Sequence, residues 1–86
     1  MNALANTNEP RQVVMPYQLA RDLLESKVQL LRQEIEKILE KWHQLDVETF
    51  QDSTKAGKIP EAETDAIIIG NLTGKLREYE DLLATL

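Results

Sequence analysis

A regular spacing of apolar residues in the first half of the chain constrains its fold more than any other feature. Seven apolar residues follow one another in alternating steps of four and three, the pattern of a helix that packs lengthwise against other helices. They are Leu24, Val28, Leu31, Ile35, Ile38, Trp42 and Leu45. Because neither Gly nor Pro interrupts residues 17–45, we expect one continuous helix over this range.

The second half predicts a short helix followed by a turn. Asp46 is a favourable N-cap residue, and Val47 and Phe50 give the short helix one apolar side. Gly57 suits the position just after a helix. We therefore expect a helix over residues 47–56.

A second long helix is expected over residues 61–85, since Pro60 is favourable at a helix start. Its apolar residues again step by three and four, and Gly70 within it suggests a kink or a close approach of another segment. The spaced positions are Ala62, Asp65, Ile69, Leu72, Leu76, Tyr79, Leu83 and Leu86. The sequence predicts an all-α fold in which the two long helices form an antiparallel hairpin joined by the short one.

The size of the chain and its leftover apolar residues favour self-association. Below about 80 residues of ordered chain, a single core seldom supplies more than about 3–5 kcal/mol, so a monomer of this chain would be marginally stable. Leu19, Leu23 and Leu30 lie off the main spacing, where one companion helix cannot bury them. We expect a homodimer that forms a four-helix bundle from residues 17–86, with residues 1–16 as a flexible arm.

Charge is unevenly distributed along the chain. Residues 1–45 hold six acidic and six basic side chains, whereas residues 46–86 hold nine acidic and four basic ones and carry the whole net charge of −5. No basic cluster supports direct nucleic-acid binding. The acidic half suits a basic protein partner, although acidic charge also simply favours solubility.

The candidate partner-binding residues are of two kinds. Glu61, Glu63 and Asp65 form an acidic patch at the start of the last helix. Apolar contacts would come from the arm or from the same helix, and the candidates are Val13, Val14, Met15, Ile67 and Ile68.

Residues that carry catalytic or metal chemistry are scarce. The chain has no Cys and one His, and the Glu40 and His43 spacing found in metal bundles falls on outer helix positions. We expect no enzyme activity, no metal and no cofactor. No stretch is apolar enough to span a membrane, and no secretory signal is visible, so a cytoplasmic protein is expected.

Several segments between residues 23 and 83 match a known pattern: Leu-Arg-Gln-Glu-Ile-Glu at 31–36, Lys-Trp-His at 41–43, Phe50, Gly-Lys-Ile at 57–59 and the acidic run 61–65. This part of the chain resembles short prokaryotic antitoxin-like proteins of toxin–antitoxin pairs. His43 stands where those proteins usually have Gly, and residues 67–69 lack their frequent Trp. The resemblance implies a regulator that covers a basic toxin. A self-associating structural or adaptor protein is the alternative.

Overall fold

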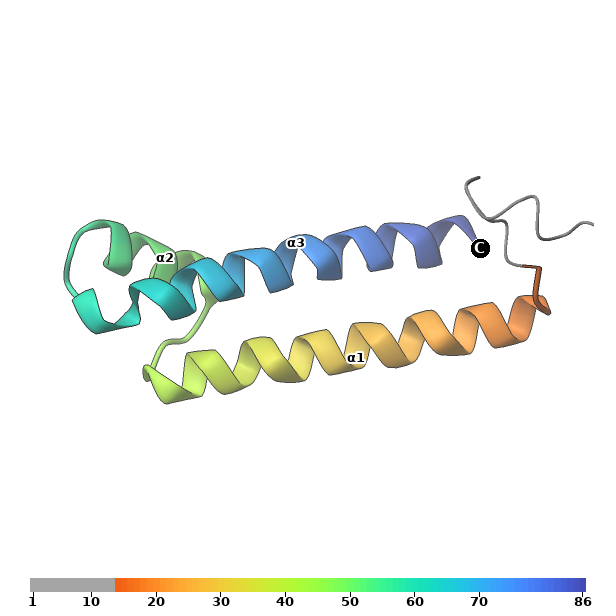
Figure 1. The fold of residues 1–86 in the computed structure, drawn as a ribbon, viewed down its shortest axis with the longest axis horizontal. Helices are drawn as coiled ribbons and strands as arrows, with labels where there is room; N and C mark the ends of the chain where they lie inside the picture. The colour runs from red at the N-terminus through yellow and green to blue at the C-terminus, as the bar shows by residue number, and fades with distance from the viewer. Residues whose placement is uncertain (1–13) are drawn as a thin grey trace, which may run out of the picture.

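The computed structural model describes residues 14–86, whose regular secondary structure is entirely helical (Figure 1). Helix α1 spans Tyr17–Lys41 and α2 spans Val47–Lys55; the 3-10 turn η2 (Pro60–Ala62) leads into α3, which spans Glu63–Thr85. The predicted all-α fold is confirmed. Of the predicted arm, residues 14–16 precede α1 without helical structure, and the remainder lies outside the described residues.

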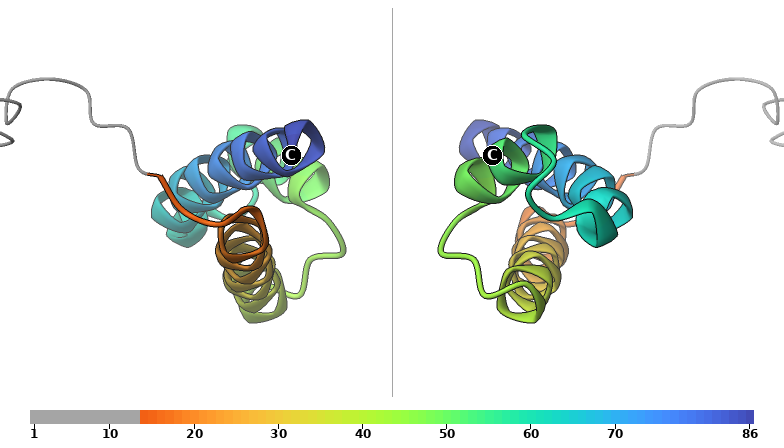
Figure 2. Two further views of the ribbon diagram at one scale, coloured as in Figure 1. Left: turned by 90° about the vertical axis from the view of Figure 1, so that its right-hand side faces the viewer. Right: turned by 90° about the vertical axis from the view of Figure 1, so that its left-hand side faces the viewer.

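Helices α1 and α3 run antiparallel and pack along their length, as predicted (Figure 1). Helix α2 lies against one side of this hairpin (Figure 2). We call the end at which α1 leads into α2 the turn end, and the end at which α1 begins and α3 finishes the terminal end. Because α2 covers only the turn end, the two ends of the hairpin are packed differently.

The core is concentrated at the turn end. Phe50 of α2 and Ile69 of α3 are fully buried, and with Ile35 and Ala62 they form one cluster. Trp42, Leu72 and Leu76 are among the half-buried side chains packed around this cluster. The sequence indicated Phe50 only as part of a short apolar side, whereas the structure places it in the middle of the core.

The predicted apolar spacing faces the core at all positions except Leu45 and the C-terminal Leu86, which is 43% exposed. Val28, Leu31, Ile35 and Ile69 are buried. The half-buried members are Leu24, Ile38, Trp42, Leu72, Leu76, Tyr79 and Leu83.

The prediction for Leu45 is wrong, since this side chain is 95% exposed. Helix α1 ends at Lys41 rather than at residue 45. His43 adopts a φ of 55°, the left-handed conformation, and the N–H groups of His43 and Gln44 donate to the carbonyl oxygens of Glu40 and Leu39. These bonds form a Schellman motif, which satisfies the last carbonyls of the helix and turns the chain. The spacing continues into residue 45 although the helix does not.

Both ends of α2 follow the predicted signals. Asp46 Oδ1 accepts the N–H of Thr49 at 2.7 Å, and this bond holds the pKa of Asp46 below its usual value. At the other end, Gly57 has a φ of 73° and the N–H of Lys58 donates to the carbonyl of Ser53. Helix α2 stops one residue before the predicted limit, at Lys55.

Gly70 marks the close approach of α2 to α3. A Cβ atom at this position would lie 3.0 Å from Nε2 of the Gln51 side chain. A larger residue would therefore push against Gln51, and the expectation of a close approach at Gly70 is confirmed.

Replacing His43 by Gly should stabilise the protein. A residue with a β-carbon is strained in the left-handed conformation, and Gly removes this strain. Gly also makes the unfolded chain more flexible, which offsets part of the benefit. We expect the free energy of unfolding to rise by roughly 0.5–1 kcal/mol. The control Gln33→Gly, in the interior of α1, should cost about 1 kcal/mol. Urea unfolding followed by circular dichroism measures both, and a loss of stability in His43→Gly would contradict the role assigned to this turn.

Replacing Phe50 by Ala should remove about 3–5 kcal/mol from the free energy of unfolding, because it leaves a cavity in the core. Since a chain of this size has few kcal/mol to lose, the variant should be largely unfolded. The control Leu45→Ala, at an exposed position, should change stability by less than about 0.5 kcal/mol. Thermal unfolding that leaves both variants equally stable would exclude Phe50 as the centre of the core.

Candidate partner-binding surface

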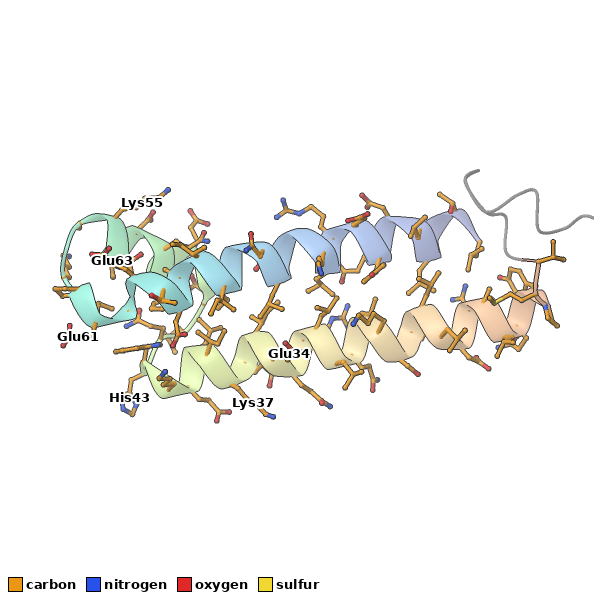
Figure 3. The ribbon with its side chains drawn as sticks, viewed as in Figure 1. Glu34, Lys37, His43, Lys55, Glu61 and Glu63 are labelled. Atoms are coloured by element: carbon orange, nitrogen blue, oxygen red, sulfur yellow. The ribbon has the colours of Figure 1, made fainter. Side chains whose placement is uncertain are left out.

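Glu61 and Glu63 lie exposed at the turn end, where η2 passes into α3 (Figure 3). Carboxylates near the start of a helix interact favourably with the positive end of its dipole. Glu61 and Glu63 therefore stabilise the start of α3 and also make its surface negative. No ion pair within residues 14–86 involves either of them. Both side chains are accessible to another molecule.

Asp65, the third member of the predicted acidic patch, points into the fold. Its Oδ2 accepts bonds from Lys41 Nζ and from Trp42 Nε1, each at 2.8 Å, and its side chain is 19% exposed. The two donors hold the pKa of Asp65 below its ordinary value of 3.8. Asp65 therefore fastens α3 to the end of α1, and we leave it out of the accessible acidic surface.

Lys41 and Trp42 complete this attachment. The Lys41 ammonium lies 5.2 Å from the centre of the Trp42 ring as well as beside Asp65. A cation against an aromatic face is attracted by the electron density of the ring. The sequence signals this contact only through the place of Asp65 on the apolar spacing of the last helix, where a carboxylate needs a partner.

A groove between α2 and α3 lies beside the exposed glutamates. It is lined by Gln51, Thr54, Lys55, Glu63, Ala66, Ile67 and Gly70. Ile67 is 68% exposed and follows Glu63 by one helical turn, so the two share a side of α3. Ile68 is turned by about 100° from Ile67 and lies on a different side of the helix.

The remaining candidates lie at the terminal end. Val14 is 94% exposed and Met15 is half-buried, both just before α1. Val13 lies outside the described residues. Because α1 is about 37 Å long, these residues and Glu61 with Glu63 do not form one site.

Metal-ligating side chains do not gather at one place within residues 14–86. In the stretch from Val14 onward, no three His, Asp or Glu side chains converge so that they could hold a metal ion. Figure 3 shows His43 pointing away from the helices. Within the same stretch, no helix combines the length and apolar character needed to cross a bilayer.

Comparisons with models of protein families, with curated proteins and with solved structures found no significant match. The resemblance to antitoxin-like proteins therefore stays a prediction from the residues that carry it.

Asp65→Asn should weaken the fold at neutral pH, because it removes the charge that Lys41 faces. A carboxyl group whose pKa is lowered by folding contributes stability above its unfolded pKa and loses it as the pH falls through the folded value. We therefore expect a lower melting temperature than in the parent at pH 7, with the difference shrinking as the pH falls below the ordinary aspartate pKa of 3.8.

Asp81→Asn, at an exposed position of α3, is the matched control and should leave the melting temperature nearly unchanged. Thermal melts across this pH range measure both variants. A difference between Asp65→Asn and the parent that does not shrink as the pH is lowered would contradict the electrostatic cause.

Proposed function

We propose that this chain is a protein-binding module whose acidic second half docks on a basic surface of a partner protein. The observation that supports this most directly is the exposure of Glu61 and Glu63 next to the exposed Ile67. Carboxylates beside an apolar side chain provide both long-range attraction and contact area. Such a combination suits recognition rather than chemistry.

Internal pairing uses few of the acidic side chains. Asp65 pairs with Lys41 and Glu80 with Arg32, the latter at 2.7 Å. The other acids of residues 46–86 take part in none of the ion pairs described within residues 14–86. They are Asp46, Glu48, Asp52, Glu61, Glu63, Glu78 and Asp81. The excess negative charge therefore remains available at the surface.

These charges predict how the association rate depends on salt. Attraction between opposite charges mainly raises the association rate, and salt screens it. Ile67 and the groove beside it would supply apolar contact. Lys55, which lines the groove, can pair with an acidic group at the edge of the partner's basic surface.

The resemblance of residues 23–83 to antitoxin-like proteins makes a basic toxin the partner we expect. The chain would then act as a regulator that covers the toxin. The alternative, a self-associating structural or adaptor protein, is favoured by the exposed leucines of α1.

The test begins with isolation of the tagged full-length chain from its host at low salt and identification of the protein that accompanies it. Association rates are then compared for the parent and for Glu61→Gln/Glu63→Gln. We expect association to slow by roughly three- to tenfold, with a weaker dependence on salt.

Glu36→Gln/Glu40→Gln is the matched control, since it removes two exposed charges from α1 instead. This control should associate at nearly the parental rate. If both pairs of substitutions slow association equally, or if neither does, the acidic surface at the turn end is not the docking site.

A further inference from the structure

One side of the hairpin carries large apolar side chains that the rest of residues 14–86 leaves about half exposed. Leu23 and Leu30 on α1 are 54% and 53% exposed. Ile68 and Leu82 on α3 are 42% and 46% exposed, and Leu86, just after α3, is 43% exposed. We call these five residues the uncovered face.

The helical register places the uncovered face opposite α2. Gly70 marks the side of α3 that meets α2. At about 100° per residue, Ile68, Leu82 and Leu86 lie about 120–160° around α3 from Gly70. On α1, Leu23 and Leu30 lie about 160–180° from Leu39, which packs against the core cluster around Phe50. Figure 2 shows α2 on one side of the hairpin only.

The core also thins toward the terminal end. Four of the six buried residues form the cluster completed by α2, and only Val28 and Leu31 continue it along α1. The strongly exposed leucines of both long helices lie mainly beyond the reach of α2. The terminal half of the hairpin therefore has no third helix packed against it within residues 14–86, whereas the turn end has α2.

We propose that the uncovered face is a homodimer interface, on which a second copy packs its own uncovered face to form a four-helix bundle. This inference is independent of docking on a basic partner. Two helices about 10 Å wide and about 37 Å long present a face of about 700 Å². That area is close to the roughly 800 Å² that each partner buries in a stable interface.

Charge favours a second copy over a charged partner. Helix α1 contains five acidic and five basic residues, so it offers no net charge for a partner to complement. Helix α3 contains five acidic and two basic residues, so two α3 helices would repel each other. A two-fold axis parallel to the helices places α1 of each copy over α3 of the other. The neutral α1 then faces the acidic α3, and the two α3 helices do not face each other.

The ion pairs within the hairpin set the register of this interface. Arg32 lies level with Glu80, and Lys41 lies level with Asp65. In an antiparallel helix pair the residue numbers of level positions add to a constant, which averages about 109 for these two ion pairs. This average places Leu23 about level with Leu86, Leu30 with Tyr79 and Glu34 with Lys75. In the dimer, Leu23 therefore meets Leu86 of the second copy, and Glu34 meets its Lys75. Opposite charges at this level complement the apolar contacts.

The first test is Leu23→Asp/Leu30→Asp in the full-length chain, with Leu45→Asp as the matched control at an exposed position off the face. Analytical ultracentrifugation should show a dimer for the parent and the control at tens of micromolar. The double variant should dissociate with a dissociation constant raised at least about a hundredfold. A monomeric parent, or equal loss in the control, would overturn the proposal.

The second test changes charged residues at the interface, so its result does not depend on whether the leucine variants fold. Glu34→Lys and Lys75→Glu each place like charges together, so each homodimer should weaken by about tenfold. An equimolar mixture of the two variants should form a heterodimer as tight as the parent, measured by native mass spectrometry. Because the rescue requires two chains, a purely intramolecular effect would not produce it. A statistical mixture without preference for the heterodimer would overturn the pairing of α1 with α3 of the second copy.

Discussion

Burial of Phe50 between the two long helices is the interaction on which the rest of the structure depends. A hairpin of α1 and α3 alone would meet along a narrow line, because each helix contributes only one apolar stripe to the contact. Helix α2 adds a third direction of packing, so Phe50 can contact Ile35, Ala62 and Ile69 in one cluster. The turn at His43 and the cap at Asp46 serve this arrangement, since they direct a nine-residue helix back against the hairpin.

The sequence predicts the helices well because their apolar spacing and their caps act locally. Asp46 and Gly57 define α2 through bonds to neighbouring residues, and these bonds form in the structure as expected. The spacing overextends α1 to Leu45 because periodicity records where a helix could face a core. It does not record where the chain must leave the helix. Burying Phe50 is worth a few kcal/mol, which outweighs the cost of a left-handed residue at His43.

The candidate site is less predictable for a related reason. Glu61, Glu63 and Asp65 form one acidic run in the sequence, and only the place of Asp65 on the apolar spacing of the last helix sets it apart. In the structure, Asp65 is the one that faces Lys41 and Trp42. Which acid becomes structural depends on the register between two helices that are distant in sequence. The charge imbalance between the two halves, by contrast, follows from composition alone. The local sequence therefore predicts the sign of the surface charge. The register between α1 and α3 decides which carboxylates lie on that surface.

The two proposed surfaces occupy different parts of the molecule and are compatible. The uncovered face lies opposite α2, whereas Glu61, Glu63 and Ile67 lie at the turn end beside the groove that α2 forms with α3. A two-fold axis parallel to the helices brings the turn ends of both copies to the same end of the bundle. The dimer then presents two acidic surfaces at the same end of the bundle, on opposite sides of it. A partner that is itself dimeric, or that carries two basic patches, would engage both at once, and the second contact would form at a high effective concentration. Self-association would in this way strengthen recognition without adding any contact to either acidic surface.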